Sequence, residues 1–316
     1  MEIVHGIDEL PSGTRLCVTI GIFDGVHRGH QQVFEVLDRT ARRLGAMPTV
    51  VTFDPHPEAV IRGAAPDLLM DRDERFERLA RLGVGIVAVQ RFDEALRRTP
   101  SDEFMRRLGA GRNLAALVMT ALSAFGRDRA GTLPVLREMG EQGGWEVVEA
   151  PTLDLHGERV SSARIRELVE AGRLGQAGAL LGHPFALVGE VVHGERRGRE
   201  LGFPTANLHF SEPVTLPPDG IYAAKASWGG ESVLSPHAAA DAVVSLGTQP
   251  TFGGKVRAFE VHLLDRDEEL YGQRMRVELC RRLRGQERYE SAAELIAQMG
   301  RDVERTRQVL AGRTDA

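Results

Sequence analysis

Apolar runs alternate with helix-like stretches over the first half of the chain. Short continuous apolar runs predict buried strands, and between them apolar residues recur every three or four positions, as on one face of a helix. Strands are expected at residues 16–20, 49–53, 85–89, 114–119 and 145–148, and helices at 29–44, around 76–82 and at 132–142. Another helix is expected at Thr99-Pro100, with the threonine at the N-cap and the proline in the first turn. Strands that alternate with helices predict a parallel sheet with helices on both faces.

The second half of the chain has a different pattern. After two successive helical stretches, at 163–171 and 173–181, strand-like runs are separated by turns that contain glycine and proline. These runs lie at 185–192, 221–228, 242–246, 258–264 and 275–279. A last helix is expected from Ser291, where Glu294 would complete a capping box, and it would bury Leu295, Met299, Val303 and Leu310. We expect a mostly antiparallel β-barrel closed by a C-terminal helix, with domains of 1–183 and 184–316.

The turn after the first strand is a candidate binding site. Residues 20–32 read IGIFDGVHRGHQQ, in which a glycine-rich turn joins the strand to the helix. The start of a helix has unsatisfied backbone N–H groups and a partial positive charge, so it suits a phosphate. His27 and His30 could donate hydrogen bonds to the phosphates of a nucleotide and stabilise the charge that builds up in nucleotidyl transfer. The alternatives are a zinc-binding pair, or two polar residues in a surface turn.

A second candidate phosphate site lies at residues 161–166, which read SSARIR. Ser162 could cap the helix that follows, while Arg164 or Arg166 binds a phosphate through two parallel hydrogen bonds. The alternative is a capped helix with solvated arginines.

Two further candidates lie in the barrel half. Residues 194–207 read GERRGRELGFPTAN, where glycines among basic residues allow the backbone to approach an anion, and the Thr205 hydroxyl and Asn207 carbonyl could bind Mg²⁺. A glycine-rich turn with a short edge strand is the alternative. Residues 259–263 alternate so that Glu260 and His262 share the polar face of a strand. Glu260 is thus either a general base toward a hydroxyl or a residue of a solvated barrel exterior.

Composition narrows the class of protein. The chain has 316 residues, enough for about two domains, and 42% of them are hydrophobic. The net charge of −5 argues against nucleic acid as a partner, and no apolar stretch is long enough to span a membrane. We therefore expect a cytoplasmic protein, in which Cys17 and Cys280 are buried free thiols. The sequence leaves open whether copies of the chain associate.

Taken together, these motifs resemble those of the bacterial bifunctional riboflavin kinase/FMN adenylyltransferase family, the prokaryotic FAD synthetases. Residues 21–30 are similar to the adenylyltransferase signature of the family, and residues 52–57, TFDPHP, to its next motif. Residues 201–207, LGFPTAN, are similar to the riboflavin kinase signature. Later kinase motifs are similar to residues 247–253, 260–265 and 270–272. The resemblance runs in order from about Leu16 to the last helix.

The resemblance implies two ATP-dependent reactions on one chain. The barrel would transfer the γ-phosphoryl group of MgATP to riboflavin, with Glu260 as the base and with Thr205 and Asn207 on Mg²⁺ and a phosphate. The first domain, a Rossmann-like nucleotidyltransferase, would transfer AMP from ATP to FMN, releasing pyrophosphate and forming FAD, with His27 and His30 on the phosphates. The residues expected to bind nucleotide are Gly21, Phe23, Asp24, Gly25, His27, His30, Ser162, Arg166, Gly198, Gly202, Pro204, Thr205 and Asn207.

Three positions of the first domain depart from the pattern of the family. Leu122 stands where the family has a carboxylate, Ser123 where it has an aromatic residue, and Ala163 where it has a threonine. A leucine cannot accept a hydrogen bond or help to hold Mg²⁺, and loss of a polar partner in a buried site costs about 1–3 kcal/mol. The chain is therefore a bifunctional enzyme, a riboflavin kinase with an impaired or altered adenylyltransferase, or a non-catalytic flavin or nucleotide sensor. The set of Thr205, Asn207 and Glu260 speaks against the sensor, which needs neither a base nor a metal site.

Overall fold

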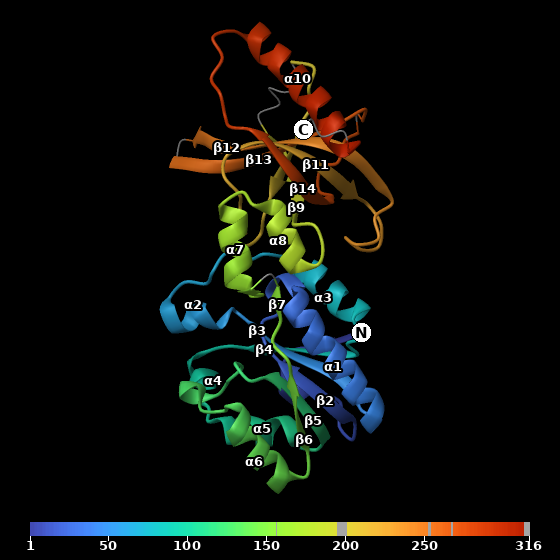
Figure 1. Ribbon diagram of the computed structural model, residues 1–316, viewed down its shortest axis with the longest axis vertical. Helices are drawn as coiled ribbons and strands as arrows, with labels where there is room; N and C mark the ends of the chain where they lie inside the picture. Colours follow the sequence, from blue (N-terminus) through green and yellow to red (C-terminus); the bar gives the residue numbers. More distant parts are fainter. Residues whose placement is uncertain (156, 195–200, 252–253, 267, 313–316) are drawn as a thin grey trace. The chain divides into compact units, whose positions relative to one another are not determined.

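The chain folds into two compact units. The computed structural model describes residues 1–155, 157–194, 201–251, 254–266 and 268–312 (Figure 1). Unit 1 consists of Met1–Pro66 and Arg75–Ser161, and unit 2 of Asp67–Glu74 and Ser162–Ala316. Unit 2 thus takes a short segment, residues 67–74, from within the first half of the sequence, and we call this segment the strap.

A six-stranded parallel sheet forms the centre of unit 1 (Figure 1). Its strands are β1 (Glu2–Val4), β2 (Arg15–Ile20), β3 (Met47–Asp54), β4 (Ile86–Arg91), β5 (Asn113–Thr120) and β6 (Glu146–Ala150). They lie in the order β1-β4-β3-β2-β5-β6, and every pair is parallel. After β2 the chain adds β3 and β4 on one side and then crosses to add β5 and β6 on the other. The carboxyl ends of β2 and β5 are therefore the switch point at which such sheets bind ligands.

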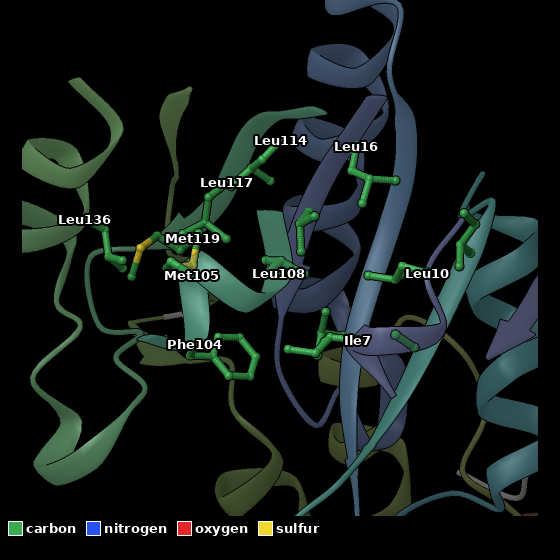
Figure 2. Packing of buried hydrophobic residues seen from close by; sticks show 14 of the residues in the cluster. Ile7, Leu10, Leu16, Phe104, Met105, Leu108, Leu114, Leu117, Met119 and Leu136 are labelled. Atoms are coloured by element: carbon green, nitrogen blue, oxygen red, sulfur yellow. The ribbon is translucent and has the colours of Figure 1, made fainter. Parts of the chain in front are cut away.

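Helices cover both faces of this sheet. The helices of this part of the chain are α1 (Arg28–Leu44), α2 (Pro57–Arg62), α3 (Arg72–Arg81), α4 (Glu94–Arg98), α5 (Ser101–Gly109) and α6 (Leu133–Gly143), of which α1, α5 and α6 pack on the sheet. There are also 3₁₀ turns η1 (Ile7–Glu9), η2 (Asp24–Val26) and η3 (Arg127–Arg129), and a hairpin of β7 (Asp154–Leu155) and β8 (Glu158–Arg159). On one face, the Cys17 thiol of β2 lies 3.8 Å from the Leu37 carbonyl of α1. On the other, Leu16 and Val18 pack with residues of α5 and α6 (Figure 2). The predicted parallel sheet with two covered faces is confirmed.

Besides the hairpin and the 3₁₀ turns, three short strands or helices of unit 1 were not expected from the sequence. They are β1, α2 and α4. The sequence predicts only a break after β3 at residues 54–57, yet Pro57 begins α2. Proline fits the first turn of a helix because the N–H that it lacks would have no partner there. His56 Nδ1 caps the helix by accepting from Glu58 N at 3.2 Å. Helix α5 begins at Ser101 with Pro100 at the N-cap, so the prediction that Thr99 caps it is wrong.

A closed antiparallel barrel forms the centre of unit 2. Its strands are β9 (Ala186–Val192), β10 (Ala206–His209), β11 (Gly220–Trp228), β12 (Ala238–Thr251), β13 (Gly254–Leu263) and β14 (Arg274–Arg284), in the order β10-β13-β12-β11-β14-β9. The helices are α7 (Ser162–Glu170), α8 (Leu174–Leu181) and α10 (Ala292–Leu310). The predicted barrel with a C-terminal helix is confirmed. Strands β12 and β14 are longer than their apolar runs, because their polar ends also pair in the barrel.

The barrel interior explains the alternation along β13. Tyr222, Val244 and Val261 lie opposite one another on β11, β12 and β13, and all three are fully buried. Phe259 and Leu263 share that inner face with Val261, so Glu260 and His262 point away from the interior. Both are half-buried rather than fully solvated.

Helix α10 is held differently from the prediction. Ser291 Oγ accepts from Glu294 N at 3.3 Å, which confirms the cap, but the Glu294 carboxylate accepts from the backbone of Glu290. The expected apolar face is only partly buried, whereas Asp302 and Thr306 are buried. The reason is an ion pair, in which Asp302 lies 2.6 Å from the Arg284 guanidinium of β14.

The strap is bound tightly within unit 2. Leu68 exchanges backbone hydrogen bonds with the segment 213–215. Arg274 of β14 pairs with Asp71 and Asp73, and Arg276 pairs with Glu74 at 3.2 Å. The side chains of this last pair are 7% and 1% exposed, so a charge from the first half of the sequence is buried in unit 2.

The two cysteines lie in different environments. Both are free thiols, as expected. Cys17 is buried, and burial raises its pKa to about 12, so it stays protonated and unreactive. Cys280 is exposed, and the prediction that it is buried is wrong, because Met275, Val277 and Leu279 occupy the inner face of β14 and turn Cys280 outward. Within the described residues, no helix is long and apolar enough to cross a membrane.

Candidate active sites

The turn between β2 and α1 is held in a strained conformation. Phe23, Gly25 and Val26 have φ angles of 56°, 79° and 39°. Positive φ is unfavourable for a phenylalanine and more so for a β-branched valine, and such strain persists only where the surroundings enforce it. Here they do, because Phe23 and Val26 are buried and the Phe23 ring lies where a Cβ on residue 21 would be, so that only Gly21 fits. Successive N–H groups in such a turn form a concavity that binds anions.

The two histidines of the turn lie together. His27 is the N-cap of α1, its Nδ1 accepts from His30 N at 3.2 Å, and the two rings stack with their centroids 3.5 Å apart. Burial lowers the pKa of His30 well below its usual value, and the nearby His27 and Arg75 lower it further. His30 is therefore neutral at physiological pH. Its Nδ1 is buried without a hydrogen-bond partner among the described residues, which is typical of a site whose ligand supplies the partner.

Two residues to which the sequence assigned no role support this turn, and of these only Thr52 lies in a motif, at residues 52–57. Thr52 Oγ1 and a guanidinium N–H of Arg75 both donate to the Ile22 carbonyl, at 3.4 and 3.2 Å. Arg75 is only 8% exposed. No signal in the sequence could have singled it out, because arginines recur every third residue along α3 and only burial distinguishes Arg75 from them.

At the end of the neighbouring strand β5 lie two departures from the family pattern, of which Leu122 is exposed and Ser123 is partly buried. Leu122 is 49% exposed, and its carbonyl accepts from Arg129 at 3.4 Å. The Ser123 hydroxyl lies 2.9 Å from that of Thr120. The buried carboxylate of this region is Asp24, which lies in the turn itself.

Ser162 and Arg166 belong to unit 2. Helix α7 begins at Ser162, so Ser161 takes the N-cap position that Ser162 was expected to hold. Arg166 donates to the Asp67 carbonyl of the strap at 2.7 Å. The binding of a nucleotide phosphate by these two residues remains a prediction.

The barrel brings Thr205, Asn207 and Glu260 together. Asn207 of β10 lies directly opposite Glu260 of β13, with Ser245 of β12 on the other side of Glu260. Because β10 pairs with both β13 and β9, it is not an edge strand. The Asn207 amide lies over Gly194, where any Cβ would collide with it. Gly198, which was expected to bind nucleotide, lies outside the described residues.

The segment before β10 is fixed by His262. Its Nδ1 lies 2.8 Å from the Pro204 carbonyl, and its ring packs edge-on against Phe203. Gly202 has a φ of 83°, which permits the turn that leads into this segment. The neighbour of Glu260 on the polar face of β13 thus positions the two residues that precede Thr205.

A small cavity of about 70 Å³ adjoins Thr205. Its wall is partly apolar, with Val191, Leu270 and the Tyr271 ring, and partly charged, with Arg266, Glu268 and Glu269. The Tyr271 ring packs on that of His193, with centroids 3.8 Å apart. An apolar cleft beside polar groups is the usual form of a small-molecule site.

Comparisons with known proteins agree with this two-site architecture. A family model described as FAD synthetase matches residues 11–164, and one described as riboflavin kinase matches residues 181–310. The bifunctional riboflavin kinase/FMN adenylyltransferase of Escherichia coli K12 is 35% identical over 96% of both chains. That of Bacillus subtilis is 31% identical over 90% of this chain and 89% of its own.

A solved structure also matches along the length of the chain. It is described as a macrolide-efflux protein from Streptococcus pneumoniae, is 29% identical, and superposes with a TM-score of 0.85 over 96% of this chain and 98% of its own. The fold is therefore shared over both units, while the name given to that protein differs from those of the curated relatives. On the identity and coverage of those relatives, the chain belongs to the bifunctional riboflavin kinase/FMN adenylyltransferase family.

Proposed function

We propose that this chain phosphorylates riboflavin to FMN in its barrel and then transfers AMP from a second ATP to FMN, forming FAD and pyrophosphate. Residues 184–316 carry the first reaction and residues 1–183 the second. The partners of the chain are the small molecules ATP, riboflavin and FMN, and it acts in the cytoplasm. Its net charge of −5 gives it no attraction for nucleic acid.

The observation that carries this proposal is the pairing of Asn207 with Glu260 beside Thr205. Phosphoryl transfer needs positioned oxygens for a metal and a phosphate, and a base that accepts the proton of the attacking hydroxyl. Glu260 lies on the outer, half-buried face of β13, where a flavin can reach it. It accepts the proton of the riboflavin 5′-hydroxyl as that oxygen attacks the γ-phosphorus, and ADP leaves.

The residues present fit Mg²⁺. Thr205 and Asn207 offer a hydroxyl and an amide oxygen, and among the described residues no cluster of three His, Cys, Asp or Glu side chains forms a cage of its own for a metal. Mg²⁺ commonly keeps its waters and binds one or two protein oxygens together with the phosphates of a substrate. When bound, the ion neutralises charge on the phosphates. Thr205 and Asn207 are the residues that would hold it.

The cavity beside Thr205 fits the base of the nucleotide. Its apolar walls and the Tyr271 ring offer a face on which an aromatic base can stack, next to the residues assigned to the phosphates. Because the cavity is small, we assign it the adenine and place the flavin on the side of Glu260.

For the second reaction, the turn of unit 1 supplies the donors. Its strained backbone lies at the switch point of the sheet, and α1 begins at its end. Neutral His30 and the N-cap His27 donate hydrogen bonds to the triphosphate, and so stabilise the charge that develops when the FMN phosphate attacks the α-phosphorus and pyrophosphate leaves. The reaction needs no covalent intermediate on the enzyme.

One experiment tests both reactions. The purified chain is incubated with ATP and Mg²⁺, once with riboflavin and once with FMN, and the flavins are resolved by chromatography. We expect FMN and FAD from riboflavin, and FAD from FMN. FMN as the sole product would support instead a riboflavin kinase with an impaired adenylyltransferase, which the leucine at position 122 in place of a carboxylate favours. If the chain bound flavin but formed neither FMN nor FAD, only a non-catalytic flavin sensor would remain as its function.

A further inference from the structure

Arg75 is a buried cation near the β2–α1 turn of unit 1, and neither of the proposed reactions uses it. Arg75 is 8% exposed, and burial of a guanidinium is costly unless its charge and N–H groups find partners. One N–H donates to the Ile22 carbonyl. The fold therefore accepts a buried cation at a point where it contacts the backbone of the phosphate-binding turn.

The bonded carbonyl is placed to control the turn. Ile22 directly precedes Phe23, the first residue with positive φ, and its carbonyl belongs to the peptide whose N–H is that of Phe23. The orientation of this peptide plane determines the direction in which the chain enters the strained segment Phe23–Val26. At the start of the turn, Gly21 N donates to Val51 O of β3, so the Ile22 peptide is the next group that must be fixed.

We propose that Arg75 is a positioning residue for adenylyl transfer, which holds the Ile22 peptide so that the N–H groups of the turn and the ring of His30 face the nucleotide phosphates. This inference rests on the proposed adenylyltransferase function. A second effect of Arg75 is electrostatic, because burial is the main cause of the low pKa of His30 and the nearby His27 and the charge of Arg75 lower it further. Arg75 thus favours the neutral His30 that the reaction uses.

The test compares Arg75→Met, Arg75→Lys and a matched control. Arg75→Met keeps the stem of the side chain and removes both its charge and its donors, whereas Arg75→Lys keeps the charge. Arg81→Met makes the same change on the same helix, at an exposed arginine paired with Glu77. FAD formation from FMN and FMN formation from riboflavin are measured on each variant, so that the kinase reports on the integrity of the chain.

We expect Arg75→Met to lower kcat/KM for FAD formation about 10- to 100-fold, the effect of one hydrogen bond from a charged donor. Arg75→Lys should fall between this variant and the wild type, and Arg81→Met should match the wild type. Riboflavin kinase activity should be unchanged in all three. FAD formation within twofold of wild type in Arg75→Met would overturn the proposal, as would an equal loss of both activities with a lower unfolding temperature.

The pH profile distinguishes positioning from a merely structural role. Without the cation, the His30 ring takes up a proton more readily, so the acid limb of FAD formation should move to higher pH in Arg75→Met. It should stay in place in Arg75→Lys, and an unmoved limb in Arg75→Met would overturn the electrostatic part of the proposal.

A wild-type chain that forms FMN but no FAD would contradict the adenylyltransferase function itself. In that case binding of inorganic pyrophosphate, a product of adenylyl transfer and not of the kinase reaction, is measured by calorimetry. Weaker binding by Arg75→Met than by Arg81→Met would still support the role of Arg75, and equal binding would overturn it.

Discussion

The two phosphate sites of this chain are built from different parts of the polypeptide. In unit 1 the donors are chiefly backbone N–H groups in a strained turn, reinforced by two stacked imidazoles. In unit 2 the working groups are side chains that neighbouring strands bring into register. A site of the first kind depends on conformation, and a site of the second kind depends on the identity of a few residues.

This difference bears on the departures from the family pattern. Leu122, Ser123 and Ala163 remove side-chain partners that the family has, but they leave the N–H groups of the Phe23–Val26 turn in place. A comparable substitution at Thr205, Asn207 or Glu260 would remove a side chain that takes part directly in the proposed reaction. We therefore expect side-chain deletions to harm the barrel reaction more than they harm adenylyl transfer.

The largest expected effect is that of Glu260→Gln. The amide keeps the shape of the side chain but cannot accept the proton of the hydroxyl, so FMN formation should fall about 10²- to 10⁴-fold. FAD formation from added FMN should be unchanged, and both rates are read from one chromatographic assay. Glu231→Gln, at an exposed position of the barrel, is the control. A normal rate of FMN formation in Glu260→Gln would show that Glu260 is not the general base.

His30→Ala should act only on the other reaction. Loss of one preorganised donor to the developing charge typically costs about 10²- to 10³-fold in rate. We expect that loss in FAD formation from FMN, with riboflavin kinase activity unchanged on the same chain. If the kinase also stopped, the division of the chain into two independent sites would be wrong.

Glu74→Gln should alter stability rather than chemistry. It breaks a buried pair with Arg276, at a cost of about 3 kcal/mol, since Glu278 still pairs with the arginine. The unfolding of unit 2 in urea should show this loss. Asp73→Asn, which removes an exposed partner of Arg274 in the same strap, should cost about 0–1 kcal/mol. Equal losses in the two variants would show that burial does not decide the strength of these pairs.

The smallest expected effect is a gain. Leu122→Asp restores the carboxylate of the family at an exposed position and should raise FAD formation about fivefold, the effect of one ordinary hydrogen bond. Val135→Asp, at another exposed apolar position of unit 1, should have no effect. No gain in Leu122→Asp would show that the backbone of the turn suffices without this carboxylate.

Much of the fold could be predicted because burial is periodic. The continuous apolar run of β2 and the alternation of Phe259, Val261 and Leu263 each identified a strand and its buried face. The prediction failed where polar contacts decide the structure. Asp302 and Thr306 lie on the predicted face of α10 and are buried more deeply than its apolar residues, and Asp302 pairs there with Arg284.

The candidate sites show the same limit. His27, His30, Thr205, Asn207 and Glu260 could be named because their residue types and spacing indicate a chemistry. Arg75 could not, and Thr52 was identified only as part of the motif 52–57, because both act through one carbonyl of a distant segment and such a contact leaves no local pattern. Sequence motifs thus identify residues that contact the substrate more readily than residues that support the shape of the site.

The strap has a consequence for dividing the protein. Glu74 belongs to unit 2 and pairs with Arg276, while the next residue, Arg75, belongs to unit 1 and holds Ile22, so one peptide bond within α3 joins groups that serve different units. No single cut of the gene can give each half all of its own residues. A barrel expressed from residue 184 onward lacks Glu74 and is left with a buried arginine short of a partner. An autonomous kinase fragment therefore calls for a neutral residue in place of Arg276.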